Sequence, residues 1–273
     1  MSMLANAPLG KKTPYVAHYQ RDLLFPIARM TNRAMLGLSH SLPFKGVDIW
    51  NAYELSWLNS KGKPVVAIGE FIFPCESPHL VEAKSLKLYL NSFNNTIFDS
   101  VDDVITTLQR DLMETTSAPV QVRVILTEQF SPVTTQTFDG ICLDQLDVTC
   151  NTYLVNPTFL QTESEVVSEV LYSNLLKSNC LITGQPDWGS VQIKYTGKKI
   201  QHAGLLQYIV SFRNHNEFGE QCVERIFLDI MQHCAPQKLS VYARYTRRGG
   251  KDINPFRSTE KGEMPENFRL CRQ

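Results

Sequence analysis

The sequence predicts an α+β fold in which each half of the chain contributes antiparallel strands and helices. Three observations support this class. Short runs with alternating apolar residues indicate strands, apolar stripes at helical spacing indicate helices, and the strand–helix–strand order occurs twice at a constant offset. Because a Gly-containing turn joins the first two strands, antiparallel connections fit better than a repeated βαβ pattern.

The first half opens with two strands, predicted at residues 48–58 and 64–73. The intervening Asn59–Lys63 contains Gly62 and polar residues, which suit a hairpin turn. The pattern Tyr-x-x-Ser-Phe-x-Asn then begins at Tyr89 and again at Tyr208, an offset of 208 − 89 = 119. Both copies therefore predict the same unit of structure.

The offset of 119 residues extends beyond this pattern. It predicts that a helix with a buried stripe occurs in both copies, followed by a strand with alternating apolar residues. The predicted helix pairs are Val104 with Val223, Leu108 with Phe227, and Leu112 with Met231. The predicted strand pairs are Val120, Val122 and Val124 with Leu239, Val241 and Ala243.

The second half is predicted to begin near residue 160. Thr162–Glu165 resembles a capping box and predicts a helix through residues 167–175. A loop at residues 184–189 then precedes a strand at residues 190–195. The two modules are accordingly residues 1–160 and 161–273, and no low-complexity linker separates them, so we expect them to pack as one body.

Composition narrows the possible functions. The 273 residues are 43% hydrophobic, with 27 basic and 27 acidic side chains. The formal net charge is therefore zero, which does not favour binding to nucleic acid or to an anionic membrane. No apolar run of spanning length and no signal-peptide pattern occur, so a cytoplasmic protein is expected. Seven scattered cysteines without a Cys-x-x-Cys pair, and histidines without ligand spacing, predict neither disulfides nor a metal site.

The segment Leu175–Gly189 contains the most informative cysteine. Cys180 is followed seven residues later by Asp187, in a loop bounded by proline and glycine. A thiol with a pKa of about 8.5 is mostly protonated at neutral pH, so a nucleophilic cysteine needs help from its surroundings. Pro186 disfavours a helix, so the chain is predicted to fold back and bring the Asp187 carboxyl near the sulfur as a base and proton donor. The alternative is an ordinary core thiol.

Three further clusters are candidates for binding. Lys84 and Lys87 lie three residues apart beside Glu82, an arrangement that suits a phosphate or a polar heterocycle, or simply a solvated helix end. The segment 213–220 places carboxylates around an aromatic residue, which suits a purine or else a helix N-terminus. The segment 245–255 has two arginines before a Gly-Gly turn, which suits phosphate binding or an exposed loop.

Together these segments resemble the 7-cyano-7-deazaguanine reductases, in the long form with two tandem tunnelling-fold modules in one chain. The likeness covers about residues 20 to 257. It is carried by residues 42–50 (LPFKGVDIW), 53–57 (YELSW), 84–93 (KSLKLYLNSF), 178–180 (SNC), 185–188 (QPDW) and 242–250 (YARYTRRGG).

The resemblance implies antiparallel sheets with helices packed on one face of each. It places a Glu-x-Lys-Ser-x-Lys motif in the N-terminal module and a catalytic Cys and Asp in the C-terminal one. The implied activity is reduction of the nitrile of 7-cyano-7-deazaguanine to 7-aminomethyl-7-deazaguanine with two NADPH, in queuosine biosynthesis for tRNA. A homodimer or higher homo-oligomer is implied, without nucleic acid or membrane as a partner.

The resemblance also implies residue roles. Cys180 looks like the nucleophile that forms a thioimidate, and Asp187 resembles the proton donor. The implied substrate contacts are Val81, Glu82, Ala83, Phe218, Gly219 and Glu220. The implied NADPH contacts are Ala83, Lys84, Arg248 and Gly249.

Two positions depart from the family pattern. Ala83 stands where the family usually has Ser or Leu, and residues 217–220 read Glu-Phe-Gly-Glu where the family reads Glu-Phe-His-Glu. Without an imidazole at Gly219, impaired turnover is expected unless His215 replaces it. Two alternatives stay open: a tunnelling-fold enzyme such as a cyclohydrolase acting on a purine or pterin, and a protein that binds the cyano base without reducing it.

Overall fold

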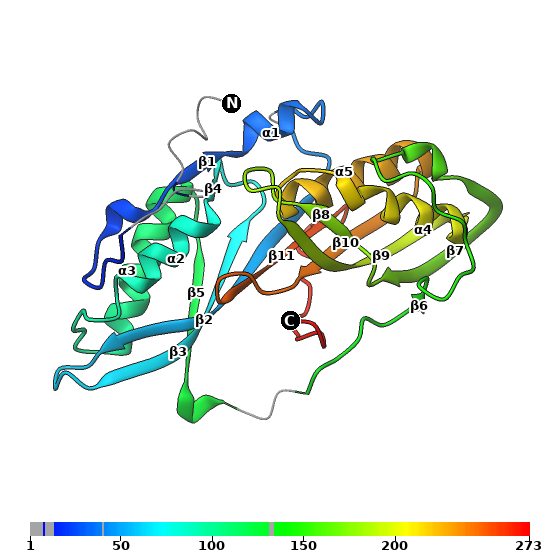
Figure 1. Cartoon of the computed structure of the whole chain (residues 1–273). Helices are drawn as coiled ribbons and strands as arrows, with labels where there is room; N and C mark the ends of the chain where they lie inside the picture. The colour runs from blue at the N-terminus through cyan, green and yellow to red at the C-terminus, as the bar shows by residue number, and fades with distance from the viewer. Residues whose placement is uncertain (1–7, 9–13, 40, 131–133) are drawn as a thin grey trace. The chain divides into compact units, whose positions relative to one another are not determined.

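The computed structural model describes residue 8 and residues 14–39, 41–130 and 134–273. Within them the protein is an α+β molecule in which antiparallel pairing predominates (Figure 1), as predicted, and it is consistent with two tunnelling-fold modules. The strands are β1 Pro26–Ala28, β2 Lys45–Leu58, β3 Pro64–Pro74, β4 His79–Val81, β5 Gln121–Leu126, β6 Ile141–Cys142, β7 Thr162–Ser173, β8 Lys177–Asn179, β9 Pro186–Ile200, β10 Lys238–Tyr245 and β11 Lys251–Ser258. The α-helices are α1 Arg29–Ala34, α2 Ala83–Asn91, α3 Val101–Thr116, α4 His202–Ser211 and α5 Gly219–Cys234. Short 3-10 helices occur at η2 Arg21–Leu23, η3 Thr127–Gln129, η4 Pro157–Phe159 and η5 Phe212–Asn214.

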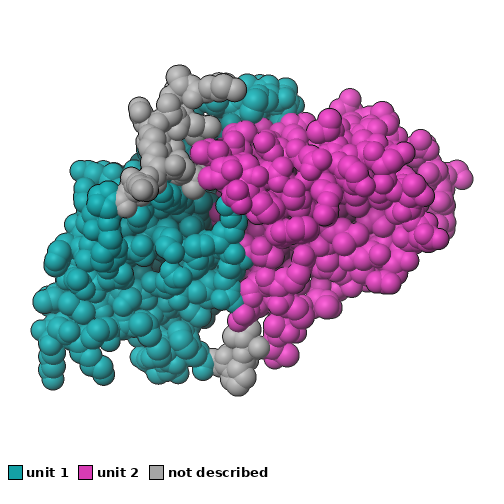
Figure 2. Space-filling model, viewed as in Figure 1, with its two compact units in different colours: residues 1–40, 49–133, 247–252 teal, residues 41–48, 134–246, 253–273 magenta. Residues whose placement is uncertain are grey.

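The chain forms two compact units, each assembled from segments that are distant in sequence (Figure 2). Unit 1 contains residues 1–40, 49–133 and 247–252, and unit 2 contains residues 41–48, 134–246 and 253–273. Strands β2 and β11 each contribute residues to both units. The predicted module boundary near residue 160 refers to the repeat in the sequence and stays a prediction.

Unit 1 contains strands in the order β5-β3-β2, with α2 and α3 alongside. The predicted hairpin between β2 and β3 is confirmed. The Asn59 Oδ1 atom accepts hydrogen bonds of 3.0 Å from the backbone N–H groups of both Lys61 and Lys63, and Gly62 has a φ of +73°. An asparagine that bonds its own backbone and a glycine in the left-handed region together fix a tight turn.

Unit 2 contains strands in the order β11-β10-β9-β7-β6, and β8 pairs with the start of β9. From Leu239 to Tyr245 every residue of β10 is buried, so this strand is covered on both faces. Tyr242 packs in a cluster with Phe138, Phe256 and Leu270 on one face. Since side chains alternate along a strand, Tyr245 projects to the opposite face, which α5 covers.

A buried charged group fixes α5 within unit 2. The Arg257 guanidinium on β11 lies 2.8 Å from the Asp48 carboxylate and 2.8 Å from the Glu224 carboxylate on α5. The side chains of all three residues are almost completely buried, and a buried charge is tolerated only when it is paired and hydrogen-bonded. The orientation of α5, which carries several candidate site residues in its first turn, is therefore strongly constrained.

The internal repeat is present, with a one-residue shift that the sequence comparison missed. Helices α2 and α4 begin 202 − 83 = 119 residues apart, but α3 and α5 begin 219 − 101 = 118 residues apart and have equal lengths. The counterparts of Val104, Leu108 and Leu112 are therefore Cys222, Ile226 and Ile230, so each of the three predicted helix pairs is wrong by one residue. Leu112 and Ile230 are both 0% exposed, whereas Met231 is only partly buried.

The prediction of a helix beginning at the Thr162–Glu165 capping box is also wrong. Residues 162–173 form strand β7, which pairs antiparallel with β9 from Val166 opposite Lys198 to Ser173 opposite Val191. A capping box stabilises a helix end by only about one or two hydrogen bonds, whereas pairing along β9 satisfies the backbone of the whole segment. The β-branched valines of this segment also favour a strand.

Candidate active site

The β8–β9 hairpin holds both predicted catalytic residues. Ser178 pairs with Asp187 in register, the Cys180 N–H donates to the Gln185 carbonyl at 2.8 Å, and the Gly184 N–H donates to the Cys180 carbonyl at 3.0 Å. The chain therefore folds back after Cys180, as predicted. One detail differs: Asp187 lies within β9, which begins at Pro186, and not in a loop.

The hairpin register places the two side chains on one face. Residues directly opposite in an antiparallel pair share a face, as do residues two apart along a strand. Asp187 is opposite Ser178, and Cys180 follows Ser178 by two positions, so Cys180 and Asp187 are diagonal neighbours. Cys180 is 6% exposed, so its thiol lies in a largely desolvated position.

The segment before α5 lies alongside this hairpin. The Asn179 N–H donates to the His215 carbonyl at 2.7 Å, and the Glu217 N–H donates to the Asn179 carbonyl at 3.2 Å. This pairing brings Phe218, and the first turn of α5, next to the residue that precedes Cys180. Gly219 and Glu220 occupy that turn, and Glu220 is 5% exposed.

Glu217 and His215 form a charged group of their own. The His215 Nε2 atom lies 2.9 Å from Glu217 Oε2, and Arg225 also contacts this carboxylate. Burial by itself raises the pKa of Glu217, but the contacts with His215 and Arg225 outweigh burial and lower this pKa below its usual value. The His215 ring is thus directed at Glu217, two residues before the start of α5.

Two neighbours of this site were not predicted from the sequence. Tyr245, the last residue of β10, is opposite Gly189, and its ring contacts the backbone at Gly219. Cys222 on α5 is completely buried, and burial raises the pKa of its thiol well above the ordinary value, so the thiol is protonated. Neither residue stands out in the sequence, because each is one more apolar position in a buried strand or helix.

Unit 1 holds the other group of candidate residues, around the start of α2. Glu82 caps this helix: its two carboxylate oxygens accept the N–H groups of Lys84 at 2.7 Å and Ser85 at 2.8 Å. Glu82 is 1% exposed, and burial raises its pKa although these hydrogen bonds and Lys251 oppose the shift. Val81 and Ala83 flank Glu82 at the end of β4 and the start of α2.

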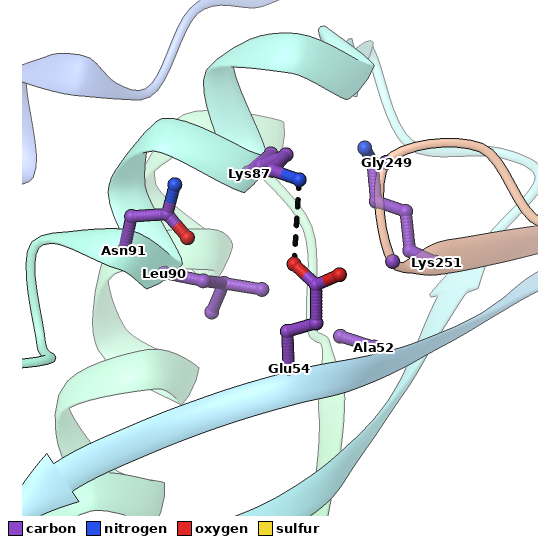
Figure 3. A pocket seen from close by; sticks show the side chains of 8 residues that line it. Ala52, Glu54, Lys87, Leu90, Asn91, Gly249 and Lys251 are labelled. Carbon is purple, nitrogen blue, oxygen red and sulfur yellow. Dashed lines mark hydrogen bonds and ion pairs between the residues drawn. The ribbon is translucent and has the colours of Figure 1, made fainter. Parts of the chain in front are cut away.

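The Arg-Arg-Gly-Gly segment forms a tight turn before β11. Gly249 and Gly250 have φ values of +59° and +74°, and the Arg248 N–H donates to the Lys251 carbonyl at 2.9 Å. This turn borders a small pocket that is partly open to solvent (Figure 3). The pocket is lined by Ala52, Glu54, Lys87, Leu90, Asn91, Gly249, Gly250 and Lys251.

The pocket combines cationic side chains with a glycine turn. The Lys87 Nζ atom lies 3.3 Å from Glu54 Oε2 (Figure 3), and a Cβ atom at Gly249 would lie 3.2 Å from Lys87 Cδ and 3.6 Å from Lys251 Nζ. Lys251 is 7% exposed, and its burial, together with Lys87 and Arg248 nearby, lowers its pKa to about 8. Amines beside an exposed glycine backbone fit the phosphate groups of a dinucleotide.

The structure thus distributes the predicted residues between two places. Cys180, Asp187, Phe218, Gly219 and Glu220 gather in unit 2, and the residues near α2 and the glycine turn gather in unit 1. Among the residues that the structure describes, no group of three or more His, Cys, Asp or Glu side chains is placed to hold a metal ion. In the same part of the chain, no helix is both long and apolar enough to cross a membrane.

Comparison with known proteins gives a consistent result along the chain. Residues 15–124 match a family model described as "Nitrile reductase, 7-cyano-7-deazaguanine-reductase N-term", and residues 186–264 match one described as "QueF-like protein". A protein of Dechloromonas aromatica is 57% identical over 98% of this chain and 95% of its own length. One of Burkholderia lata is 56% identical over 98% of both chains, and one of Legionella pneumophila is 57% identical over 97% of this chain and 94% of its own. All three are named NADPH-dependent 7-cyano-7-deazaguanine reductase.

Proposed function

Because the chain belongs to the 7-cyano-7-deazaguanine reductase family, we propose that it reduces the nitrile of 7-cyano-7-deazaguanine to the aminomethyl group of 7-aminomethyl-7-deazaguanine in queuosine biosynthesis. The overall reaction consumes two NADPH and two protons per nitrile and gives the amine and two NADP⁺. The observation that carries this proposal is the β8–β9 hairpin, which presents a buried thiol and a carboxyl group on one face.

Cys180 is the proposed nucleophile. Its sulfur adds to the electrophilic nitrile carbon, and the nitrile nitrogen takes up a proton, which gives a thioimidate bound to the chain. Asp187, the diagonal neighbour of Cys180 across the hairpin, is proposed to take the proton of the Cys180 thiol as the carbon–sulfur bond forms and to pass it to the nitrile nitrogen. Covalent addition divides one difficult reduction into steps that each need a smaller activation energy.

NADPH, when bound, supplies a hydride to the former nitrile carbon in each of the two reductions. Between them the carbon–sulfur bond breaks, which returns Cys180 as a thiolate. Lys84, Arg248 and Gly249 are the proposed phosphate contacts, with Ala83 contributing its backbone. Their support is the glycine turn with positive φ, which lies beside the half-buried Lys87 and the buried Lys251.

Two carboxylates are proposed as contacts for the deazaguanine base, as the family resemblance implies. In unit 2 this carboxylate is Glu220, and in unit 1 it is Glu82, with Val81 and Ala83 beside it. Each is proposed to accept hydrogen bonds from ring N–H groups or the exocyclic amine. Each carboxylate is at least nine-tenths buried, so a hydrogen bond to it is strong and its loss is costly. Phe218 immediately precedes Glu220's helical turn and offers an aromatic face for the base.

Gly219 is proposed to make reduction slower than adduct formation. The family resemblance implies an imidazole at this position, and glycine supplies neither a donor nor a proton relay. The nearest histidine in sequence, His215, is directed at Glu217 and is therefore not proposed as the replacement. Binding and covalent addition then proceed, while proton delivery in the later steps is less efficient.

We also propose that the protein is a cytoplasmic homo-oligomer, as the family resemblance implies. The exposed Ile141 on β6 and Val166 on β7 support further association at the last strands of unit 2. Light scattering on the purified protein is expected to give a mass of at least two chains, and a single-chain mass would contradict this proposal.

One assay tests the proposed function directly. Purified protein, 7-cyano-7-deazaguanine and NADPH are combined, and NADPH oxidation is measured together with the amine product. The proposal requires two NADPH oxidised for each amine formed. Stoichiometric adduct without NADPH oxidation would identify a binding protein instead, and release of a hydrolysed purine or pterin product would identify a cyclohydrolase-like enzyme.

A further inference from the structure

The ring of Tyr245 occupies a slot between two glycines in unit 2. A Cβ atom at Gly189 would lie 3.2 Å from Tyr245 Cδ1, and one at Gly219 would lie only 2.8 Å from Tyr245 Cε2. Neither glycine has a positive φ, so the backbone conformation does not require glycine at either place. Because Gly189 and Gly219 have no side chains, the tyrosine ring has room to approach both.

The register of β9 and β10 directs this tyrosine toward the proposed proton donor. Tyr245 is opposite Gly189, and Asp187 precedes Gly189 by two positions on the same strand. Asp187 is consequently the diagonal neighbour of Tyr245 on the same face of the sheet, within reach of a long aromatic side chain. Asp187 thus has Tyr245 beside it from β10 and Cys180 beside it from β8.

The Tyr245 hydroxyl is buried, and within the described part of the chain only the weakly accepting Cys222 thiol lies within hydrogen-bond reach of it. Its neighbours include the Cys222 thiol, the Asp187 carboxyl and the Glu220 carboxyl, and burial together with these groups raises the pKa of Tyr245 well above its usual value. The hydroxyl is therefore neutral and keeps a proton to donate. A thiol sulfur is a weak acceptor, so the donor is poorly satisfied at this buried position and a stronger acceptor such as a carboxylate fits it better.

We propose that Tyr245 is a positioning residue for the reduction, whose hydroxyl donates a hydrogen bond to the Asp187 carboxyl and holds it toward Cys180 when the base is bound. The inference rests on the proposed function of Cys180 and Asp187. It extends that function by naming the group that orients the proton donor, and by giving Gly189 and Gly219 the role of admitting the ring that carries this group.

The first test is Tyr245→Phe, which removes the hydroxyl and keeps the ring. The protein is mixed with 7-cyano-7-deazaguanine without NADPH, and adduct formation is followed by intact-mass spectrometry. We expect the same final extent, one adduct per chain, at a rate reduced by roughly ten- to a hundredfold, as for loss of one hydrogen bond to a charged group. The melting temperature should stay the same or rise, because the variant removes a buried hydroxyl whose hydrogen bonding is poor.

The second test is Gly219→Ala, which keeps the hydroxyl and displaces the ring. Its Cβ atom forces Tyr245 to move, so adduct formation should slow by a similar factor. In the double variant the two effects should not multiply, because both disturb the same contact. If the two rate reductions multiply in the double variant, the Tyr245 hydroxyl and Gly219 do not act through the same contact.

Tyr242→Phe is the matched control on the same strand. Tyr242 is 4% exposed, but its hydroxyl already contacts Arg244 and the Glu266 carbonyl and lies on the opposite face of β10. This variant should lose stability and keep the rate of adduct formation. A normal rate in Tyr245→Phe would overturn the positioning role, whereas the absence of any adduct in the unmodified protein would overturn the proposed function itself.

Discussion

Ser178 and Asp187 are directly paired across the β8–β9 hairpin, and this pairing sets the distance along the sheet between Asp187 and Cys180. The hairpin is held by backbone hydrogen bonds on both sides, to Gln185 across the turn and to residues 215–217 alongside. The relative position of thiol and carboxyl is therefore fixed by rigid backbone and not by side-chain conformation alone.

Covalent addition predicts a mass increase at a single cysteine. Mixing the protein with 7-cyano-7-deazaguanine without NADPH should add one substrate mass per chain, and Cys180→Ala should abolish the increase. Cys271→Ala is the control, because Cys271 is exposed and is not part of the proposed site. An adduct that survives in Cys180→Ala and disappears in Cys271→Ala would show that Cys271, and not Cys180, is the nucleophile.

Replacement of Asp187 by Asn keeps the side-chain shape but removes the acidic proton. NADPH oxidation should fall by roughly two to four powers of ten if Asp187 is the general acid. The matched control is Asp139→Asn, an exposed acid in the same unit. A large drop in the melting temperature of Asp187→Asn, instead of a loss of rate, would assign Asp187 a structural role.

Gly219 offers a comparison between two side chains at one position. Gly219→His and Gly219→Ala both push the Tyr245 ring aside, since each introduces the same Cβ atom. Only histidine adds an acid–base group, so NADPH oxidation should be about ten- to a thousandfold faster in the histidine variant than in the alanine variant. Steady-state kinetics with both variants measures this ratio, and equal rates would show that an imidazole has no function here.

Lys84 is expected to contribute to NADPH binding. In Lys84→Ala the KM for NADPH should rise roughly tenfold through loss of a charged phosphate contact, with a smaller effect on the KM for the nitrile. The increase should shrink at high salt, because the attraction is screened. Lys61→Ala, at the exposed β2–β3 turn, provides the control, and an unchanged KM for NADPH in Lys84→Ala would remove Lys84 from the site.

Lys251 should make stability depend on pH in the alkaline range. Its pKa is lowered from 10.5 to about 8 in the fold, mainly by burial. Between these two pH values the unfolded chain binds the proton and the folded chain does not, so this residue makes stability rise with pH, by roughly 3 kcal/mol in total. Below pH 8 Lys251 is protonated in both the folded and the unfolded chain, so its destabilising effect no longer changes with pH.

Lys251→Met should remove this dependence and raise stability at neutral pH. Urea unfolding at several pH values between 7 and 10.5 measures the effect, with Lys61→Met as the exposed control. The difference in unfolding free energy between Lys251→Met and the unmodified protein should change with pH. If it does not, burial does not lower the pKa of Lys251 in the folded protein.

The sequence was sufficient where local chemistry decides the structure. The Asn59–Lys63 turn, the apolar stripe of α3 and the two αβ repeats follow from turn residues and periodicity, which act over a few residues. The same local rules failed at residues 162–173, where pairing with β9 outweighs a helix-start signal. They also missed the single-residue shift between α3 and α5, because both registers place apolar residues on the helix.

Cys180, Asp187, Glu82 and Glu220 were recognised as candidates because a reactive residue type in a distinctive segment is visible in the sequence alone. The tertiary structure alone decided which groups surround them. It paired Asp187 with Ser178, placed the Tyr245 ring against Gly219, and buried Lys251 beside the glycine turn. Tyr245 and Gly219 are tens of residues apart, and strand register and burial, which set both proximity and pKa, leave no signal at any one position in the sequence.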